Sequence, residues 1–468
     1  MRSTFFGLSS ALSGIMANQR QIDTVNHNVD NADSPGYTRQ RVDVAAAPAW
    51  SNPAWNHSTV PGQLGTGVQM IDMTRMRDQF IDLQFRSESA KFGTYDARAT
   101  ALDRLNRVVD EPGDAGITSL LNKYFGAWTA LQIKPEGASQ RQGVRAAGVD
   151  LAQGFKDMRQ QLLNTQAEET TRINAETTNI NTWATQINDI NLQIFKVEAL
   201  GHAPNDLKDQ RDILIDKLAA TGNVALTTLA NGKVTVSYGG QVLVDATTDT
   251  VNNVAVNAAG VVNVGAAVAT LTDGSLKGHI DVRDTIVGGA TGYLAQLDTI
   301  ANTIITQANA IHAAGFGLNG GTGVNFFTGT NAGNIAVDPA IMGSTDAIAA
   351  SATAADLIGG SGAALNMAHL ATTSLVINGA TTTIGGSWSS WVSKLGIDTD
   401  QAGRLREAQK AVLDVATARR DSVSGVNLDE EITDMVKFQK SYNAAARMMT
   451  TIDSMLETIV TRMGLVGR

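Results

Sequence analysis

The chain has 468 residues, which is enough for two to four domains with separate cores. Its net charge of −9 argues against wrapping nucleic acid, because that function needs a basic surface. Cysteine is absent, so disulfides, thiolate nucleophiles and zinc–thiolate sites are excluded. Only 17% of the residues are charged and 45 are glycine, a balance that suits a subunit packing closely against copies of itself.

The N-terminal segment MRSTFFGLSSALSGIM makes a poor secretory signal. Its apolar stretch is interrupted, and no small-residue cleavage site follows a solid hydrophobic core. No run in the chain approaches the roughly 18 apolar residues of a membrane span. We therefore expect no membrane insertion, and we expect that export, if it occurs, uses a route without a cleaved signal peptide.

An amphipathic helix is predicted at the N-terminus. Apolar residues recur at intervals of seven, with two more in the intervening heptad positions: Leu8, Ile15, Ile22 and Val29, then Phe5 and Leu12. The intervening positions turn polar at Gln19 and Asn26. Ser34-Pro35-Gly36 ends the pattern, because proline lacks a backbone donor and glycine admits a turn.

A stronger heptad occupies the C-terminus. All ten of its apolar positions follow one stripe: Met435, Phe438, Tyr442, Ala445, Met449, Ile452, Leu456, Ile459, Met463 and Val466. Asn427 is predicted to cap this helix, with Glu430 three residues further on. The pattern fits a coiled coil and equally fits a long amphipathic helix on a globular core. Two such stripes at opposite ends of a chain can bury each other, which would make the middle an insertion.

The middle of the chain is predicted to be mainly helical. Residues 155–200 contain neither glycine nor proline, and their isoleucines at 173, 180, 187 and 194 indicate a long helix of a bundle. Trp183, Ile190 and Val197 fill the second stripe of this helix. Further helices are predicted at 76–109, 117–131, 205–220 (capped by Asn205), 293–313 and 401–421.

Strand patterns follow in residues 223–285, which alternate in VTVSYGGQVLVD and carry turn signals at Asn231-Gly232 and Gly239-Gly240. Residues 376–384 are predicted to form a hairpin, with Trp388 and Trp391 as buried anchors. Glycine-rich stretches at 315–323, 359–362 and 385–386 are predicted to be loops. The fold class is therefore mainly α with an inserted β domain. We expect an inner terminal domain of residues 1–60 and 428–468, a helical bundle of 61–222 and 286–427, and an outer β domain of 223–285.

Patterns that suggest chemistry do not withstand inspection. Residues 315–320, GFGLNG, match the dinucleotide fingerprint in letters, but a helix precedes them where the fingerprint needs a strand. Asp398, Asp400 and Gly403 approach a calcium loop but lack its remaining carboxylates, so a helix cap is the preferred role for either aspartate.

The six histidines are far apart, and no HExxH or GxSxG motif occurs. The densest basic group is Arg75, Arg77 and Arg86, and it is mixed with acidic residues. Asp206, Asp209, Arg211 and Asp212 indicate either a solvated face or salt bridges within the bundle. We expect no enzyme activity, no cofactor and no metal.

Several motifs resemble the axial proteins of the bacterial flagellum, the family of rod, hook and hook-associated subunits. The motifs are LSSALSGI (8–15), VNHNVDN (25–31) and SPGYTRQ (34–40). Three later stretches, 204–218, 292–327 and 422–449, resemble the hook-associated members of that family. The resemblance covers about half of the chain directly and includes both ends, whereas residues 343–390 match nothing that we can assign.

The resemblance implies a structural subunit of the junction between hook and filament. It implies paired terminal helices, a helical bundle outside them, and export in an unfolded state through the flagellum-specific type III pathway. Expected partners are further copies of itself in a ring-like homo-oligomer, the hook protein, the next hook-associated junction protein and a cytoplasmic export chaperone. For the assembly interface we select, from the two stripes, Leu8, Leu12, Ile15, Ile22, Val29, Met435, Phe438, Tyr442, Met449, Ile452, Leu456 and Ile459. Met435, Phe438, Tyr442 and Met449 are also the expected chaperone contact.

Two alternatives stay open at this point. One is another axial protein, the hook or distal-rod subunit, although those relatives usually lack the long helix and contain more β structure; flagellin fits less well because its termini differ. The other is a secreted coiled-coil adhesin or effector that would bind a host ligand with its β insert. Copurification with sheared flagella would separate the axial proteins from an effector.

Overall fold

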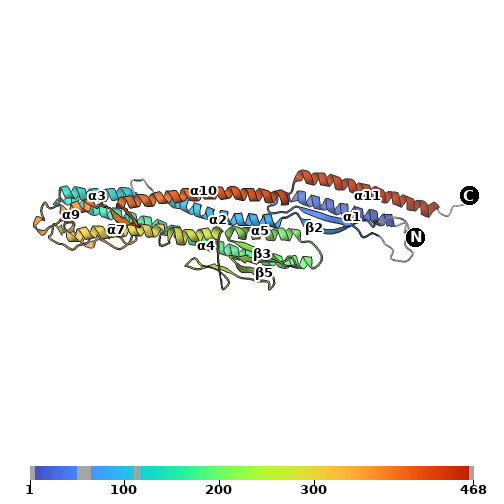
Figure 1. The fold of residues 1–468 in the computed structure, drawn as a ribbon, viewed down its shortest axis with the longest axis horizontal. Helices are drawn as coiled ribbons and strands as arrows, with labels where there is room; N and C mark the ends of the chain where they lie inside the picture. The colour runs from blue at the N-terminus through green and yellow to red at the C-terminus, as the bar shows by residue number, and fades with distance from the viewer. Residues whose placement is uncertain (1–5, 50–64, 110–112, 114–115, 463–468) are drawn as a thin grey trace.

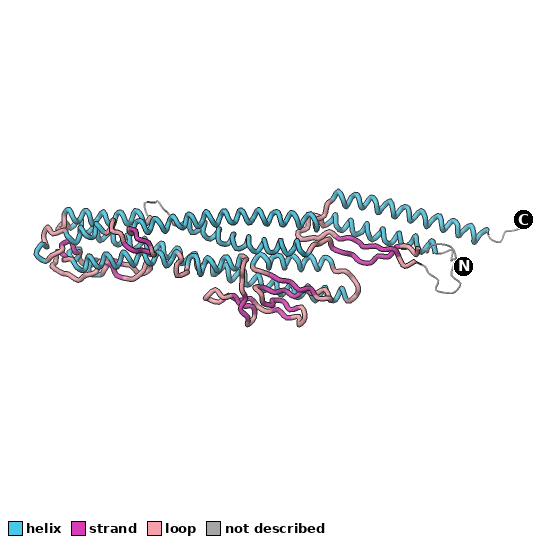
Figure 2. The backbone as a smooth tube through the Cα atoms, in the orientation of Figure 1, coloured by secondary structure: helices cyan, strands magenta, loops and turns pink. Residues whose placement is uncertain are grey.

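The computed structural model is an elongated molecule with both termini at the same end (Figure 1). It describes residues 6–49, 65–109, 113 and 116–462. Long helices run along the molecule, while strands are confined to short sheets (Figure 2). The prediction of a mainly α fold with β elements is confirmed. Phe5, Met463, Val466 and the predicted domain boundary at 60/61 lie outside the described residues.

The end of the molecule that carries the termini is built from two helices and a hairpin. Helix α1 (Phe6–Asp30) lies between helix α11 (Leu428–Arg462) and the antiparallel strands β1 (Gln40–Ala46) and β2 (Val68–Arg75). Asn427 accepts a hydrogen bond from the backbone N–H of Asp429 and so caps α11 as predicted (3.1 Å). The β1–β2 hairpin was not predicted, and it straddles the expected boundary between the first two domains.

The middle of the molecule consists of long helices packed side by side. Helix α2 (Gln79–Val108) packs against α10 (Ile384–Ser424) on one side and against α5 (Asn205–Thr221) and α6 (Ser275–Asp281) on another. Helix α4 (Ala138–Glu198) runs from the far end of the molecule to this region (Figure 1). It buries Ile173, Ile180, Ile187 and Ile194, the stripe that the seven-residue spacing predicted.

The end away from the termini holds the larger hydrophobic core. Helices α3 (Ile117–Ile133), α7 (Tyr293–Ala314) and α9 (Gly362–His369) enclose it with the adjoining ends of α4 and α10. Its largest fully buried side chains include Trp128, Trp388 and Trp391, so both predicted tryptophan anchors are buried. Short elements close this core, namely α8 (Pro339–Gly343) and the strands β10 (Phe316–Gly317), β11 (Phe327–Thr328), β12 (Ala336–Val337), β13 (Ala349–Ser351), β14 (Leu375–Ile377) and β15 (Ala380–Thr382).

Two small antiparallel sheets lie beside the C-terminal half of α4 (Figure 1). One has the order β3-β4-β5-β6 and the other β7-β8-β9, formed by Val224–Thr228, Val234–Tyr238, Gln241–Asp245, Thr250–Val251, Val254–Val256, Val262–Val264 and Ala267–Ala269. Gly239 and Gly240 adopt positive φ of 58° and 82° in the predicted turn between β4 and β5. The β structure ends at Ala269, and residues 275–287 are helical, so the last part of the range expected as a β domain is not β.

Some helix limits and caps differ from the predictions. Helix α10 begins near Gly385 and Gly386, which were expected in a loop, because Thr383 caps the helix by accepting from the N–H of Gly386 (3.0 Å). The predicted cap by Asp398 or Asp400 is therefore wrong, since both lie inside α10. Asn205 is the first residue of α5 rather than its cap, and its side chain bonds elsewhere.

Candidate assembly interface

Helices α1 and α11 pack against each other in antiparallel orientation. A Cβ added at Gly7 would lie 3.1 Å from Ile452, and one at Gly14 would lie 3.9 Å from Ala445. Each step of seven along α1 therefore matches a step of seven backwards along α11. The two glycines let the larger side chains of α11 approach the backbone of α1. The heptad of α11 thus faces another helix of the same chain.

Most of the predicted interface residues are half-buried. This group contains Leu8, Ile15, Ile22 and Val29 on α1, and Met435, Phe438, Tyr442, Met449, Ile452 and Leu456 on α11. Leu12 and Ile459 are exposed instead, at 45% and 39%. A single pair of helices covers only one side of each stripe, which explains why these side chains retain accessible surface.

Further apolar side chains of this region are open to solvent. Met16 on α1 and Leu428, Ile432, Val436, Met448, Met455 and Val460 on α11 are all exposed. On α11, Leu428 lies on the heptad stripe, seven residues before Met435, and the other five flank the stripe on both sides. A helix that is apolar well beyond its intramolecular contact is typical of a protein that buries more surface in an assembly.

The inner end of the helix pair is joined by buried polar contacts. Asn28 donates from Nδ2 to the Glu431 carboxylate and to the Gln40 carbonyl, each at 2.9 Å. Its Oδ1 accepts from the Tyr37 hydroxyl at 2.8 Å and from the Gln40 N–H at 3.0 Å. Asn28 and Glu431 are each 1% exposed. The side-chain amide of Asn28 therefore uses its full bonding capacity to connect α1, the following loop and α11.

Arg39 connects the two C-terminal helices. Its backbone N–H donates to the carbonyl of Ser424, at the end of α10 (2.9 Å). Its guanidinium donates to Glu431 at 2.6 Å and to Glu430 at 2.9 Å, in the first turn of α11. Charge-assisted bonds of this kind are stronger than neutral ones, and the guanidinium holds both acceptors in a fixed geometry. Arg39 therefore sets the position of α11 relative to α10.

A second cluster joins the hairpin and α2 to α5. Arg75 donates to Asp209 at 2.7 Å and to Asp212 at 2.8 Å, while Arg77 donates to Asp212 at 2.6 Å. Arg86 donates to Asp216 at 2.6 Å, and Arg420 of α10 reaches the other oxygen of Asp216 at 2.7 Å. The alternative of salt bridges within the molecule is thus the one observed for Asp209 and Asp212.

Electrostatics in this cluster follow from its geometry. Burial raises the pKa of the Asp212 carboxyl, but the guanidinium groups of Arg77, Arg75 and Arg86 outweigh that effect and lower it below its ordinary value. Burial, together with the nearby carboxylates of Asp206 and Asp209, raises the pKa of the Tyr37 hydroxyl. Both groups therefore keep one charge state at neutral pH and act as fixed parts of the structure.

The SPGYTRQ motif is fitted against α5. Gly36 has a φ of +78°, and a Cβ there would lie 2.4 Å from Ile213. The next residues bond to the same helix, since the N–H of Thr38 donates to Asp209 at 3.0 Å. Asn205 of α5 donates to the Gln40 side chain at 3.1 Å and to the Met73 carbonyl at 2.9 Å. Two separate motifs of the sequence therefore meet in space.

Sequence reasoning missed this polar cluster as a unit. The three arginines and the aspartates of α5 were each noticed, but Arg75 and Asp209 lie 134 positions apart and were not paired. The signal that could have identified the cluster is that the sequence has one dense group of arginines and one helix rich in aspartates, which can neutralise each other. Asn28, Arg39 and Glu431 were not selected at all, although each lies in a motif that was identified.

Nothing in the described part of the chain suggests catalysis. A groove of about 640 Å³ lies between residues 32–39, α5 and residues 421–427, but Asp212 and Asp216 in its wall are paired with guanidinium groups. The described residues hold no group of three or more histidine, aspartate or glutamate side chains suited to a metal. Among the described helices, none is long and apolar enough to cross a membrane. The exposed apolar side chains of the terminal helix pair, together with the ion pairs at its inner end, are typical of a structural subunit of a larger assembly.

Comparisons with known proteins agree with this class. Residues 102–327 match the model of the flagellar hook-associated protein FlgK helical domain, and residues 420–462 match that of the flagellar basal body rod FlgEFG protein C-terminal. Flagellar hook-associated protein 1 of Bacillus subtilis is 33% identical over the full length of both chains. The protein of the same name from Escherichia coli is 23% identical, over 97% of this chain and 99% of the relative.

A solved structure supports the fold. The flagellar hook junction protein FlgK from Burkholderia pseudomallei superposes with a TM-score of 0.64, covering 73% of this chain and all of that one at 16% identity. With the full-length identity to the Bacillus subtilis relative, the chain belongs to the flagellar hook-associated protein 1 family.

Proposed function

We propose that this protein is a structural subunit of the bacterial flagellum that forms the junction between hook and filament. The observation that carries the proposal is the full-length similarity to flagellar hook-associated protein 1 of Bacillus subtilis. The fold adds a physical argument, because the terminal helices leave apolar stripes that a polymer of subunits would cover.

The terminal helix pair would form the inner part of a ring of copies of this chain. Residues 1–60 and 428–468 would pack there together with strand β2, which pairs with β1. The remainder of 61–222 and 286–427 would lie outside them, and the β sheets, which end at Ala269, would be outermost. The half-buried residues Leu8, Ile15, Ile22, Met449 and Ile452 would complete their burial against neighbouring copies. The hook protein would lie on one side of the ring and the next hook-associated protein on the other.

Export would take place in the unfolded state and without a cleaved signal peptide. A cytoplasmic chaperone would hold Met435, Phe438, Tyr442 and Met449 before export. Phe438 shares its heptad position with Ala445 and Ile452, which pack on α1, so chaperone and α1 would compete for this side of α11. Such competition would keep the terminal pair from folding and polymerising inside the cell.

Deletion of the gene, followed by electron microscopy of the cells and assay of flagellin in the medium, tests the function. Complete hooks without filaments, together with flagellin released into the medium, are the expected result. Cells without hooks would move the protein to the rod or the hook. Normal filaments would exclude a junction role and favour the secreted adhesin or effector.

A further inference from the structure

The second half of α10 turns its larger apolar side chains to solvent. Between residues 397 and 424 the helix has six isoleucine, leucine and valine residues, and five are 38 to 69% exposed: Ile397, Leu405, Val412, Val415 and Val423. At about 100° per residue these five fall on one side of the helix. We call this side the outer face of α10.

The side of α10 that contacts its own chain is, by contrast, largely polar. Thr399 donates to the Leu102 carbonyl (3.5 Å), and Gln409 donates to the Glu88 carboxylate at 2.6 Å. Arg420 lies 3.7 Å from the centre of the Phe85 ring. A helix with polar residues toward its own core and apolar residues toward water has the reverse of the usual pattern. Its outer face is therefore expected to be covered in the assembled protein.

Helix α4 offers a surface of matching shape. Small side chains recur on its exposed side at spacings of three and four residues: Ala167, Thr171, Ala175, Thr178, Thr182 and Thr185. Each of the four threonine hydroxyls donates to a carbonyl one turn earlier, at 2.9 to 3.0 Å. Because the hydroxyls are bonded within the helix, methyl groups remain to contact a partner. Small residues on one helix form the groove into which larger residues of another can pack.

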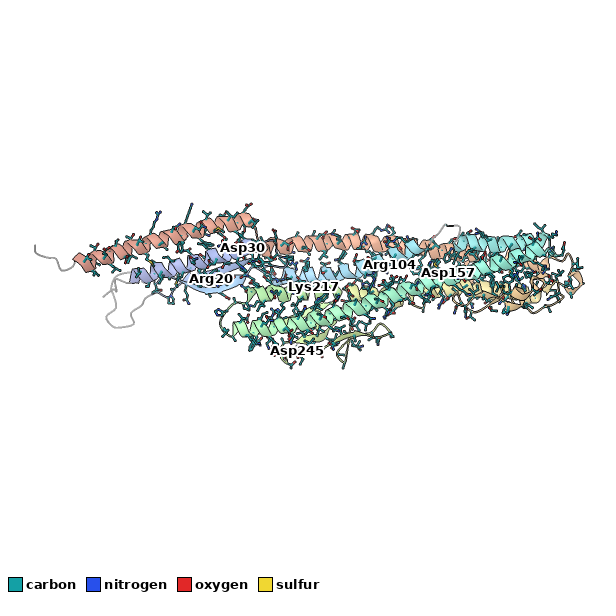
Figure 3. All side chains as sticks on the ribbon, turned by 180° about the vertical axis from the view of Figure 1, so that it is seen from behind. Arg20, Asp30, Arg104, Asp157, Lys217 and Asp245 are labelled. Atoms are coloured by element: carbon teal, nitrogen blue, oxygen red, sulfur yellow. The ribbon has the colours of Figure 1, made fainter. Side chains whose placement is uncertain are left out.

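The two surfaces lie at the same height along the molecule. At one end, Thr399 bonds to Leu102, and Arg104 nearby pairs with Glu168 of α4. At the other end, Arg420 of α10 pairs with Asp216 of α5. The same helix α5 also reaches α4, because Arg211 donates to the Asn191 side chain at 2.9 Å. Figure 3 labels Arg104 and Asp157 and shows α10 and α4 extending over the same span of the molecule, with α10 on the upper edge and α2 between them.

Size, rather than net charge, matches the two surfaces. The outer face of α10 includes Arg404 and Arg419, but Arg404 is paired with Asp400 of its own helix. The exposed side of α4 has both Asp189 and Lys196 beyond its small residues. A ridge of large apolar side chains and a shallow groove of small ones would fit each other better than two like surfaces would.

We propose that the outer face of α10 packs into the small-residue face of α4 on a second copy of this chain. The inference rests on the proposed function, and it adds the lateral contact between neighbouring subunits. The two surfaces differ, so the contact is head-to-tail, and repeating it generates a ring or a helical array rather than a closed dimer.

The absence of cysteine from the chain allows a direct test. Cells that lack the native gene would express Val412→Cys and Thr178→Cys with two different epitope tags. Sheared flagella would be treated with a short bis-maleimide crosslinker and probed for both tags. Val415→Cys with Thr182→Cys provides a second pair, and Thr171→Cys and Thr185→Cys cover a shift of two helical turns either way. Val412→Cys with Thr227→Cys, an exposed residue of β3, is the matched control.

A crosslinked dimer that carries both tags, absent from the control pair and from each single variant, is the expected result. Crosslinking of Val412→Cys alone would indicate a symmetric contact and overturn the proposal. A crosslink from α10 to a different protein would also overturn the proposal. So would the absence of any crosslinked product in flagella that contain both variants. Normal flagella that lack the protein altogether would instead refute the proposed function, so the two failures are distinguishable.

Discussion

Asn28 and Glu431 lie 403 positions apart, yet their side chains share a buried hydrogen bond of 2.9 Å. The bond matters because the heptads of α1 and α11 repeat every seven residues, so a slip of one heptad would preserve many apolar contacts. It would separate Asn28 from Glu431 and leave both buried without their partner. A buried polar pair of this kind specifies register in helix pairs. We infer that it fixes the alignment of the terminal helices.

Replacing Asn28 with alanine tests this role. The substitution removes the partner of the Tyr37 hydroxyl, of the Gln40 N–H and carbonyl, and of one Glu431 oxygen, and the terminal pair should lose about 2 kcal/mol. Hydrogen exchange of α1 and α11 would measure the change as faster exchange. Asn26→Ala is the control, because Asn26 is exposed two residues earlier on the same helix. Equal exchange in the two variants would contradict the assignment.

Comparing alanine substitutions at Gly36 and Gly201 separates two costs: the steric contact of the SPGYTRQ motif with α5, and the backbone strain of a positive φ. Both have a φ of +78°, so alanine costs about 1 kcal/mol at either position for conformation alone. Only at Gly36 would the new Cβ also meet another group, Ile213 at 2.4 Å, whereas nothing lies within 4 Å of a Cβ at Gly201. Urea unfolding should therefore show Gly36→Ala to be less stable than Gly201→Ala by about 1 to 3 kcal/mol. Similar losses would mean that Ile213 moves away at little cost.

The sequence predicted the long helices well because their apolar residues repeat locally. The stripe at Ile173, Ile180, Ile187 and Ile194 is buried along α4. The limits of α10 were missed because Thr383 caps the helix and two glycines are tolerated in its first turn. Local patterns favour a break there, whereas the buried Trp388 and Trp391 hold the segment helical by tertiary packing.

The polar part of the site was harder to predict for a physical reason. Arg77 and Asp212 are ordinary charged residues in the sequence, and nothing within a few positions of either one identifies the other. Their pairing depends on α2 and α5 lying side by side, which only the whole fold determines. Periodicity predicted the apolar stripes of α1 and α11. It could not predict which of their side chains the other helix covers and which stay exposed.

His312 should make the larger core sensitive to mild acid. Its Nδ1 donates to the Val324 carbonyl at 2.6 Å, while Nε2 accepts from the N–H of Ala349 at 2.9 Å, an arrangement open only to the neutral ring. Burial lowers the pKa of His312 to about 4, opposed in part by the bond to Val324. The unfolded chain therefore binds more protons between pH 6.5 and 4, and stability falls as the pH falls through that window.

The full loss from this histidine is on the order of 3 kcal/mol. Urea unfolding at several pH values would measure it, with His312→Gln as the variant that no longer titrates. The variant should be less stable at pH 7 but should have a flatter dependence between pH 6.5 and 4. His202→Gln is the control, because His202 is exposed. A slope unchanged in His312→Gln would assign the acid sensitivity to other groups.

Ile452→Asp tests the terminal helix pair as the site of assembly. The side chain of Ile452 lies against Gly7, so a carboxylate there would be placed between two helices without a partner. We expect secretion of the variant to continue, because the proposed export route carries the chain unfolded, while incorporation into flagella should fall to background. Immunoblots of the culture medium and of sheared flagella would measure the two quantities separately. Ser454→Asp, on an exposed position two residues further along α11, should assemble normally. Normal filaments in the Ile452→Asp strain would mean that assembly does not depend on this helix contact.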